Sequence, residues 1–264
     1  MNSKSMIVIV PLNVASYEKT DADAENNEYI RGYFKTIDKK RENDLWIKNR
    51  INIFINYTFR SLIKQTNQDF TACIIYDDRT EEIVNSEVKK YGKLPNNIMF
   101  ISKSIADIFI KQKILGSEYV YFTRIDSDDM YHKEYIQKLY DHNIIPGTVA
   151  LLNPWGYIYD SFNDKLAVYN AKVNSCYTLI YKTEDYLTGK VQSVITDQLD
   201  AQMGGVWNLP SGKEDIEGIN HIWHMHSKNI LSCFEEWFTN KWTNYTGDQI
   251  NDINIIKQIL NDFR

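Results

Sequence analysis

The chain has 264 residues, enough for one large α/β domain whose core needs no disulfide or structural metal. Its 30 Lys and Arg against 35 Asp and Glu give a net charge of −5 without any basic cluster, which argues against a general nucleic-acid binder. Cys73, Cys176 and Cys233 are too far apart to indicate a disulfide or zinc framework, so we expect reduced thiols. No signal-peptide pattern or transmembrane run of roughly 18 apolar residues is found. We therefore expect a cytoplasmic protein, with peripheral membrane contact left open.

The first half of the chain alternates apolar runs with helical periodicity. This alternation is typical of a Rossmann-type, mostly parallel sheet flanked by helices and built with right-handed crossovers. The apolar runs predict strands over residues 6–12, 70–76, 98–102 and 119–123, and the periodic segments predict helices over residues 47–62, 80–91, 104–115 and 131–142.

The second half is less regular and predicts antiparallel strands beside the parallel sheet. We expect strands over residues 148–152 and 175–181, a hairpin-like pair over 157–159 and 166–169, and a terminal helix over 250–260. Residues 13–43 are polar and longer than an ordinary connection, so they are either a functional lid with a short helix near 28–36 or a solvated insertion.

Three carboxylates follow the apolar run at residues 119–123. Asp126 and Asp128 are one residue apart, a spacing that lets two carboxylates in a turn converge on a hard cation. The alternative is that Asp128 or Asp129 caps the helix expected after Met130. Three adjacent acids exceed what a cap requires and repel one another without a cation, so the group favours a metal site.

Two further positions join this group. Asp77 and Asp78 end another buried run, where carboxylates can accept hydrogen bonds from ribose hydroxyls or base N–H groups, although Asp78 equally suits a helix N-cap. Arg124 lies two residues before Asp126 and on the same strand face, where it could bind phosphate or hold a carboxylate.

These residues resemble those of GT-A type glycosyltransferases, and more narrowly the rhamnosyltransferase family of bacterial surface-glycan loci. The chain after Pro11 departs from the usual opening of GT-A enzymes. The matching pieces are Trp46 and Arg50, residues 61–70 (SLIKQTNQDF) with 74–78 (IIYDD), residues 123–129 (TRIDSDD) and, more weakly, residues 222–229 (IWHMHSKN).

The resemblance implies a role for each cluster. Asp77, Asp78, Arg124 and Asp126 would bind the nucleotide sugar, and Asp126, Asp128 and His226 would hold Mn²⁺ or Mg²⁺ against its diphosphate. Any one of His221, His224 and His226 could instead be an ordinary surface or core histidine. An inverting transferase also needs a general base, for which we expect Asp197, with Asp215 as the alternative; isolated acids in polar loops are more often simply solvated.

The resemblance implies a single GT-A-like domain with antiparallel acceptor-side strands. Residues 1–130 would bind the donor, about 131–245 the acceptor, and 246–264 would form a C-terminal helix. We expect a metal-dependent glycosyltransferase that moves a sugar, rhamnose being the one that the family name suggests, from a nucleotide-diphosphate donor to a glycan or glycolipid. Two alternatives remain: a Mg²⁺-dependent nucleotidyltransferase, although no Gly-rich phosphate loop follows the first strand, and a non-catalytic carbohydrate-binding or scaffold module.

Overall fold

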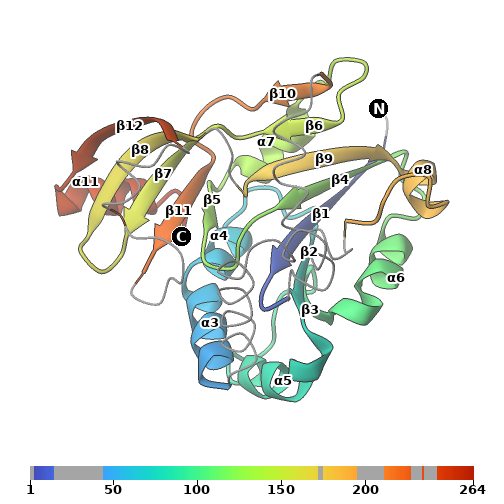
Figure 1. Cartoon of the computed structure of the whole chain (residues 1–264), viewed down its shortest axis with the longest axis horizontal. Helices are drawn as coiled ribbons and strands as arrows, with labels where there is room; N and C mark the ends of the chain where they lie inside the picture. Colours follow the sequence, from blue (N-terminus) through green and yellow to red (C-terminus); the bar gives the residue numbers. More distant parts are fainter. Residues whose placement is uncertain (1–2, 15–43, 172–174, 195–210, 227–233, 235–242) are drawn as a thin grey trace, which may run out of the picture.

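A computed structural model of the chain describes residues 3–14, 44–171, 175–194, 211–226, 234 and 243–264. Its larger sheet has seven strands in the order β10-β6-β9-β4-β1-β2-β3 (Figure 1). Only β9 runs against its neighbours in this sheet, which confirms the mostly parallel α/β architecture. The strands are β1 (Lys4–Pro11), β2 (Thr71–Tyr76), β3 (Ile98–Ser102), β4 (Tyr119–Arg124), β6 (Ala150–Leu152), β9 (Tyr177–Lys182) and β10 (Lys213–Asp215).

The strand order reverses next to β1. The chain passes from β1 to β2 and β3 on one side, and then returns to place β4 on the other side of β1. Ligands of open α/β sheets bind outside the carboxyl ends of the strands at such a reversal. The end of β4 is therefore the expected binding edge, and it is where the three acids lie.

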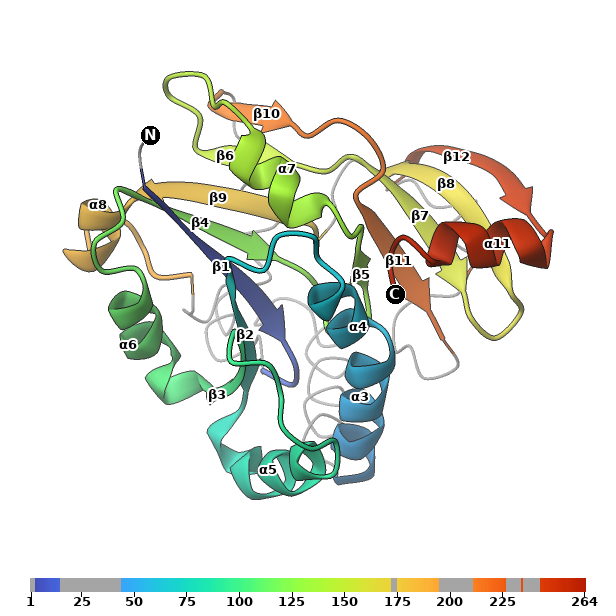
Figure 2. The same cartoon turned by 180° about the vertical axis from the view of Figure 1, so that it is seen from behind.

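Helices cover both faces of the large sheet (Figure 2). Because side chains alternate along a strand, Met6, Val8 and Val10 of β1 face one layer of the core and Ile7 and Ile9 face the other. The first layer contains residues of α3 (Asp44–Asn56), α4 (Thr58–Ile63), α5 (Glu81–Lys89) and α7 (Tyr135–Asp141), and the second contains residues of α6 (Lys103–Lys113) and α8 (Thr183–Leu187).

A smaller five-stranded sheet stands beside the large one, in the order β12-β8-β7-β11-β5 (Figure 1). The predicted hairpin is confirmed, since β7 and β8 pair in antiparallel fashion. The C-terminal helix α11 (Ile253–Leu260) packs its buried Ile256 and Leu260 on this sheet. The strands are β5 (Met130–Tyr131), β7 (Trp155–Asp160), β8 (Lys165–Ala171), β11 (His221–Met225) and β12 (Thr243–Ile250).

Three predicted boundaries were wrong. The single helix over 47–62 is interrupted at Tyr57, whose ring lies against the His224 ring with centroids 3.8 Å apart. The helix predicted from residue 131 begins at Tyr135, because Met130–Tyr131 pair with β11. The terminal helix begins at Ile253, because the residues before it form β12. The helix expected near residues 28–36 lies outside the described residues.

In the part of the chain that the structure describes, no helix is long and apolar enough to cross a membrane.

Candidate functional site

The three acids lie on the acid turn, residues 125–129, which connects β4 of the large sheet to β5 of the small one. The Ile125 N–H donates to the Ile9 carbonyl at 3.1 Å, so the turn leaves the sheet beside β1. Residues 125–129 therefore emerge at the β1–β4 reversal and join the two sheets directly.

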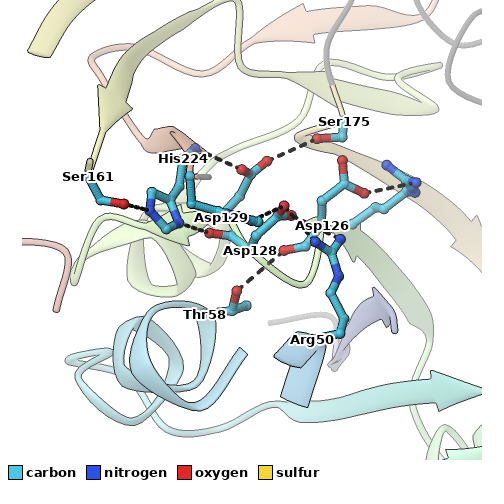
Figure 3. A network of polar contacts seen from close by, with 10 residues as sticks. Arg50, Thr58, Asp126, Asp128, Asp129, Ser161, Ser175 and His224 are labelled. Atoms are coloured by element: carbon cyan, nitrogen blue, oxygen red, sulfur yellow. Dashed lines mark hydrogen bonds and ion pairs between the residues drawn. The ribbon is translucent and has the colours of Figure 1, made fainter. Parts of the chain in front are cut away.

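Asp128 is held by two partners from distant parts of the chain (Figure 3). Arg50 of α3 donates from both terminal nitrogens to its two oxygens, at 2.7 and 3.2 Å. His226 Nε2 lies 3.2 Å from Asp128 Oδ2. Burial by itself would raise the pKa of Asp128, but the Arg50 charge and the His226 contact outweigh it and hold this pKa well below its usual value. Asp128 is therefore a buried, charged carboxylate.

Asp126 is paired with the arginine two residues before it. Arg124 Nη2 lies 3.1 Å from Asp126 Oδ1, which confirms that the two side chains share a strand face. The Arg124 side chain is 7% exposed and that of Asp126 is 37% exposed, so the carboxylate is the accessible member of this pair. Each of the first two acids thus has its own arginine.

Asp129 has different surroundings, because the backbone of the small sheet holds it. Its Oδ1 accepts the His224 backbone N–H at 3.0 Å and its Oδ2 accepts the Ser175 hydroxyl at 3.5 Å (Figure 3). Burial, reinforced by the neighbouring Asp128 and Asp126 charges, raises the pKa of Asp129 well above its usual value. The helix-capping alternative was wrong for both Asp128 and Asp129, since α7 starts at Tyr135 after Glu134.

His224 is the residue that sequence reasoning did not assign. Its ring Nδ1 lies 3.0 Å from the Asp128 backbone carbonyl, which can only accept, so Nδ1 carries the proton. The other nitrogen, Nε2, then accepts the Ser161 hydroxyl at 2.8 Å. Burial lowers the pKa of His224 to about 3, which keeps the ring neutral. Together with its backbone N–H, His224 therefore fixes the acid turn from two sides; in the sequence it was visible only as one of three closely spaced histidines.

The acids after β2 have local partners. Asp77 caps the short 3₁₀ turn η1 (Asp78–Thr80) by accepting the Arg79 N–H at 2.9 Å, and the Arg79 side chain also contacts both of its oxygens. The Arg79 hydrogen bonds lower the pKa of Asp77. Asp78 accepts the Ser104 backbone N–H at 3.2 Å and the Ser104 hydroxyl at the start of α6. The N-cap predicted for Asp78 before Glu81 was wrong, because Thr80 is the N-cap of α5; Asp78 instead accepts a backbone N–H in the first turn of α6, whose N-cap is Ser102.

Of the two candidates for the general base, only Asp215 lies in the described part of the chain. Asp215 ends β10 and is exposed, and its register partner Leu152 is in turn the partner of Tyr177, which pairs with Arg124. Asp215 therefore lies at the same edge as the acid turn, three strands from β4. Asp197 lies outside the described residues.

The residues around Asp128 fit a hard divalent cation that is held by few protein ligands. Asp128 Oδ2 and His226 Nε2 are 3.2 Å apart, close to the spacing of about 3.0 Å between adjacent ligands in an octahedron with bonds of about 2.1 Å. Within the described residues, no group of three or more His, Cys, Asp or Glu side chains is arranged to hold a metal ion. A cation here would therefore take its remaining ligands from water and substrate phosphates, as Mg²⁺ usually does.

The sequence matches the model of one protein family. The family model described as "Putative rhamnosyl transferase" matches residues 35–176, more than half of the chain and including the acid turn and Arg50. No protein with a curated description matches the sequence significantly.

Among solved structures, the chain is similar to residues 1–349 of S. aureus TarS at 17% identity, with a TM-score of 0.38. The match covers 83% of this chain and 60% of that one, so the chain spans less than two thirds of that fragment. The same fragment in complex with UDP and with UDP-GlcNAc gives TM-scores of 0.35 and 0.36, again at 17% identity, covering 84% and 85% of this chain and 60% of that one. The extent of the family match shows that the chain belongs to the rhamnosyl transferase family.

Proposed function

We propose that this chain transfers a sugar, rhamnose being the one that its family name suggests, from a nucleotide-diphosphate donor to a hydroxyl of a glycan or glycolipid. The observation that carries the proposal is the pairing of Asp126 with Arg124 and of Asp128 with Arg50 at the β1–β4 reversal. Carboxylates at this edge can bind a cation, and arginines can bind phosphates. A nucleotide diphosphate with its divalent cation requires both kinds of residue.

The donor would lie along the carboxyl edge of the sheet. β2 and β4 flank β1, so Asp77 and the acid turn are separated by two strand spacings, about 10 Å. We place the nucleoside near Asp77 and the diphosphate at the acid turn. The Asn13 side chain supports the nucleoside end, since it accepts the Asp77 backbone N–H at 3.1 Å and donates to the Thr80 hydroxyl at 2.9 Å.

The charge of the diphosphate would be met by Arg50 and Arg124, whose guanidinium groups can each donate two parallel hydrogen bonds to phosphate. Asp128 and His226, the two predicted ligands that lie together, would hold Mn²⁺ or Mg²⁺ with water and phosphate oxygens, and the bound ion would act as a Lewis acid on the departing diphosphate. Arg50 and His226 favour the ionised form of the Asp128 carboxylate, because they hold its pKa low.

The acceptor would approach from the other side of the acid turn. Inversion in a single displacement needs a carboxylate that takes the proton from the attacking hydroxyl. Asp215 suits this side, because β10 is separated from β4 by β9 and β6, about 14 Å away and opposite to Asp77. Asp197 remains the other candidate for the base.

We also propose that the reaction takes place in a reducing compartment such as the cytoplasm. Cys73 is a buried free thiol, as is usual for proteins that are kept reduced.

The proposal is tested by a thermal-shift screen of nucleoside diphosphates and nucleotide sugars, each with and without Mn²⁺. A true donor should raise the melting temperature, since a ligand that binds only the folded state stabilises it by mass action. Asp128→Asn should abolish this response to nucleotide with Mn²⁺, whereas Asp215→Asn should keep it and lose turnover if Asp215 is the base. Absence of any nucleotide response in the unmodified chain would refute the proposed function.

A further inference from the structure

The two acids that face the proposed donor site, Asp126 and Asp128, each form an ion pair with an arginine in the structure. Arg124 contacts Asp126. Arg50 contacts Asp128 through both terminal nitrogens of its guanidinium group (Figure 3). A divalent cation arriving alone would therefore meet two positive charges at the carboxylates that should attract it. A diphosphate arriving alone would meet two carboxylates beside the arginines that should bind it.

Asp128 is the carboxylate where this competition is sharpest. A carboxylate offers about four lone-pair positions, and Arg50 and His226 together take three hydrogen bonds at the two oxygens of Asp128. The Asp128 side chain is 10% exposed, so little water screens the Arg50 charge. A cation at Asp128 must therefore displace Arg50 or remain next to an unscreened positive charge, which is costly at the low effective dielectric of a buried site.

Arg50 combines an anchored backbone with a donor, Nε, that is not used among the described residues. Its helix α3 is anchored in the core by Ile47, Ile51 and Phe54 on the buried face. The Arg50 side chain is 20% exposed, and its buried Nε atom has no hydrogen-bond partner among the residues that the structure describes. On turning toward a phosphate, this guanidinium would exchange its two charge-assisted hydrogen bonds to Asp128 for two to phosphate oxygens, and its Nε would supply a further donor.

We propose that Arg50 is the resident counter-ion of Asp128, which suppresses cation binding in the absence of donor and turns onto the donor diphosphate when cation and donor bind together. This inference rests on the proposed function and adds its order of events: neither the cation nor the diphosphate binds well alone. By linkage, each must then raise the affinity for the other by the same factor.

The test measures Mn²⁺ binding by isothermal titration calorimetry, in the presence and absence of UDP, for the full chain and for Arg50→Gln. The unmodified chain should bind Mn²⁺ at least about tenfold more tightly with UDP present. Arg50→Gln should bind Mn²⁺ alone at least about tenfold more tightly than the unmodified chain, because the competing charge is gone. The same variant should bind UDP with Mn²⁺ more weakly, because a phosphate partner is lost.

Two further variants control for the loss of an arginine elsewhere on the surface and for a failure of Arg50→Gln to fold. Arg60→Gln removes an exposed arginine from the adjacent helix α4 and should leave every affinity unchanged. If Arg50→Gln does not fold, Arg50→Lys retains the charge but loses the fork and should show the same changes at smaller size. Equal Mn²⁺ affinity of the unmodified chain and of the Arg50 variant without UDP would overturn the inference. In that case UDP binding with Mn²⁺ would still support the proposed function, whereas failure to bind UDP under any condition would refute both.

Discussion

At the scale of single residues, Asp128 and Asp129 are adjacent buried acids in opposite environments. Asp128 is balanced by Arg50 and His226, and its pKa is held low. Asp129 accepts hydrogen bonds but has no ion pair with a positive side chain in the described part of the chain, and burial raises its pKa. The two side chains therefore contribute to folding stability with opposite sign.

Replacing each acid by its neutral isostere should separate these contributions. Asp128→Asn leaves the guanidinium of Arg50 without its anion, so it should lower the free energy of unfolding by about 3 kcal/mol. Asp129→Asn replaces a carboxyl group whose ionisation burial and the neighbouring acids oppose, while its side-chain oxygen can still accept the His224 N–H, so it should raise this free energy by about 1 kcal/mol. Urea unfolding at pH 7 without metal measures both, and a change of the same sign in both variants would contradict this account.

At the scale of elements, the small sheet is held together by a close approach between β7 and β11. Gly156 of β7 lies beneath the fully buried ring of His221, whose Nε2 bonds the Tyr169 hydroxyl of β8. A Cβ at Gly156 would lie 2.6 Å from His221 Nε2 and 2.7 Å from a Tyr169 ring carbon. This position requires glycine because of space rather than backbone conformation.

Gly156→Ala should therefore lower the free energy of unfolding by about 2 kcal/mol, since overpacking of a buried site forces side chains out of their preferred rotamers. Gly92→Ala provides a contrast, because nothing lies within 4 Å of a Cβ there and the strain comes only from its positive φ of 78°. Thermal unfolding of both variants checks the prediction, which fails if Gly156→Ala is as stable as the unmodified chain.

Elements with strong local patterns were predictable, and those fixed by tertiary contacts were not. The run at residues 98–102 coincides with β3, because a short apolar segment between turn residues has few alternatives. Met130–Tyr131 followed a helical pattern but pairs with β11, some 90 residues later in the chain. The interruption at Tyr57 likewise depends on His224. No local periodicity reports such partners.

In the site, too, the features set by local sequence were predictable and those set by tertiary contacts were not. The position of the acids at the end of β4 and the Arg124–Asp126 pair followed from strand geometry. The contact of Arg50 with Asp128, 78 residues away, could not be predicted because it depends on how α3 packs against the sheet. The role of His224 was missed for the same reason, since its ring and backbone act on a turn 95 residues earlier.

At the scale of the whole molecule, stability should fall in mild acid because of buried neutral histidines. Burial lowers the pKa of His221 to about 3, whereas the unfolded chain takes up this proton near pH 6.5. The contribution of His221 is therefore complete above pH 6.5 and decreases as the pH falls toward 3, by about 1.4 kcal/mol per pH unit. Between pH 7 and pH 5 it should cost about 2 kcal/mol.

Urea unfolding at pH 7 and pH 5 measures this loss, and His221→Gln isolates it, because glutamine cannot take up the proton. The variant should be less stable than the unmodified chain at pH 7 but should show a shallower decline on acidification. His132 offers a graded comparison, because partial burial also lowers its pKa: His132→Gln should flatten the decline less than His221→Gln does. An equal decline in the unmodified chain and in His221→Gln would rule out this source of acid sensitivity.

The short connection between β4 and β5 has a mechanical consequence for the whole molecule. Five residues span the gap from one sheet to the other, and the same five carry every carboxylate of the cluster. A rigid-body rotation of one sheet against the other would bend this linker and move Asp128 away from the guanidinium of Arg50. A hinge motion of the two sheets around a substrate would therefore break the Arg50–Asp128 ion pair between them.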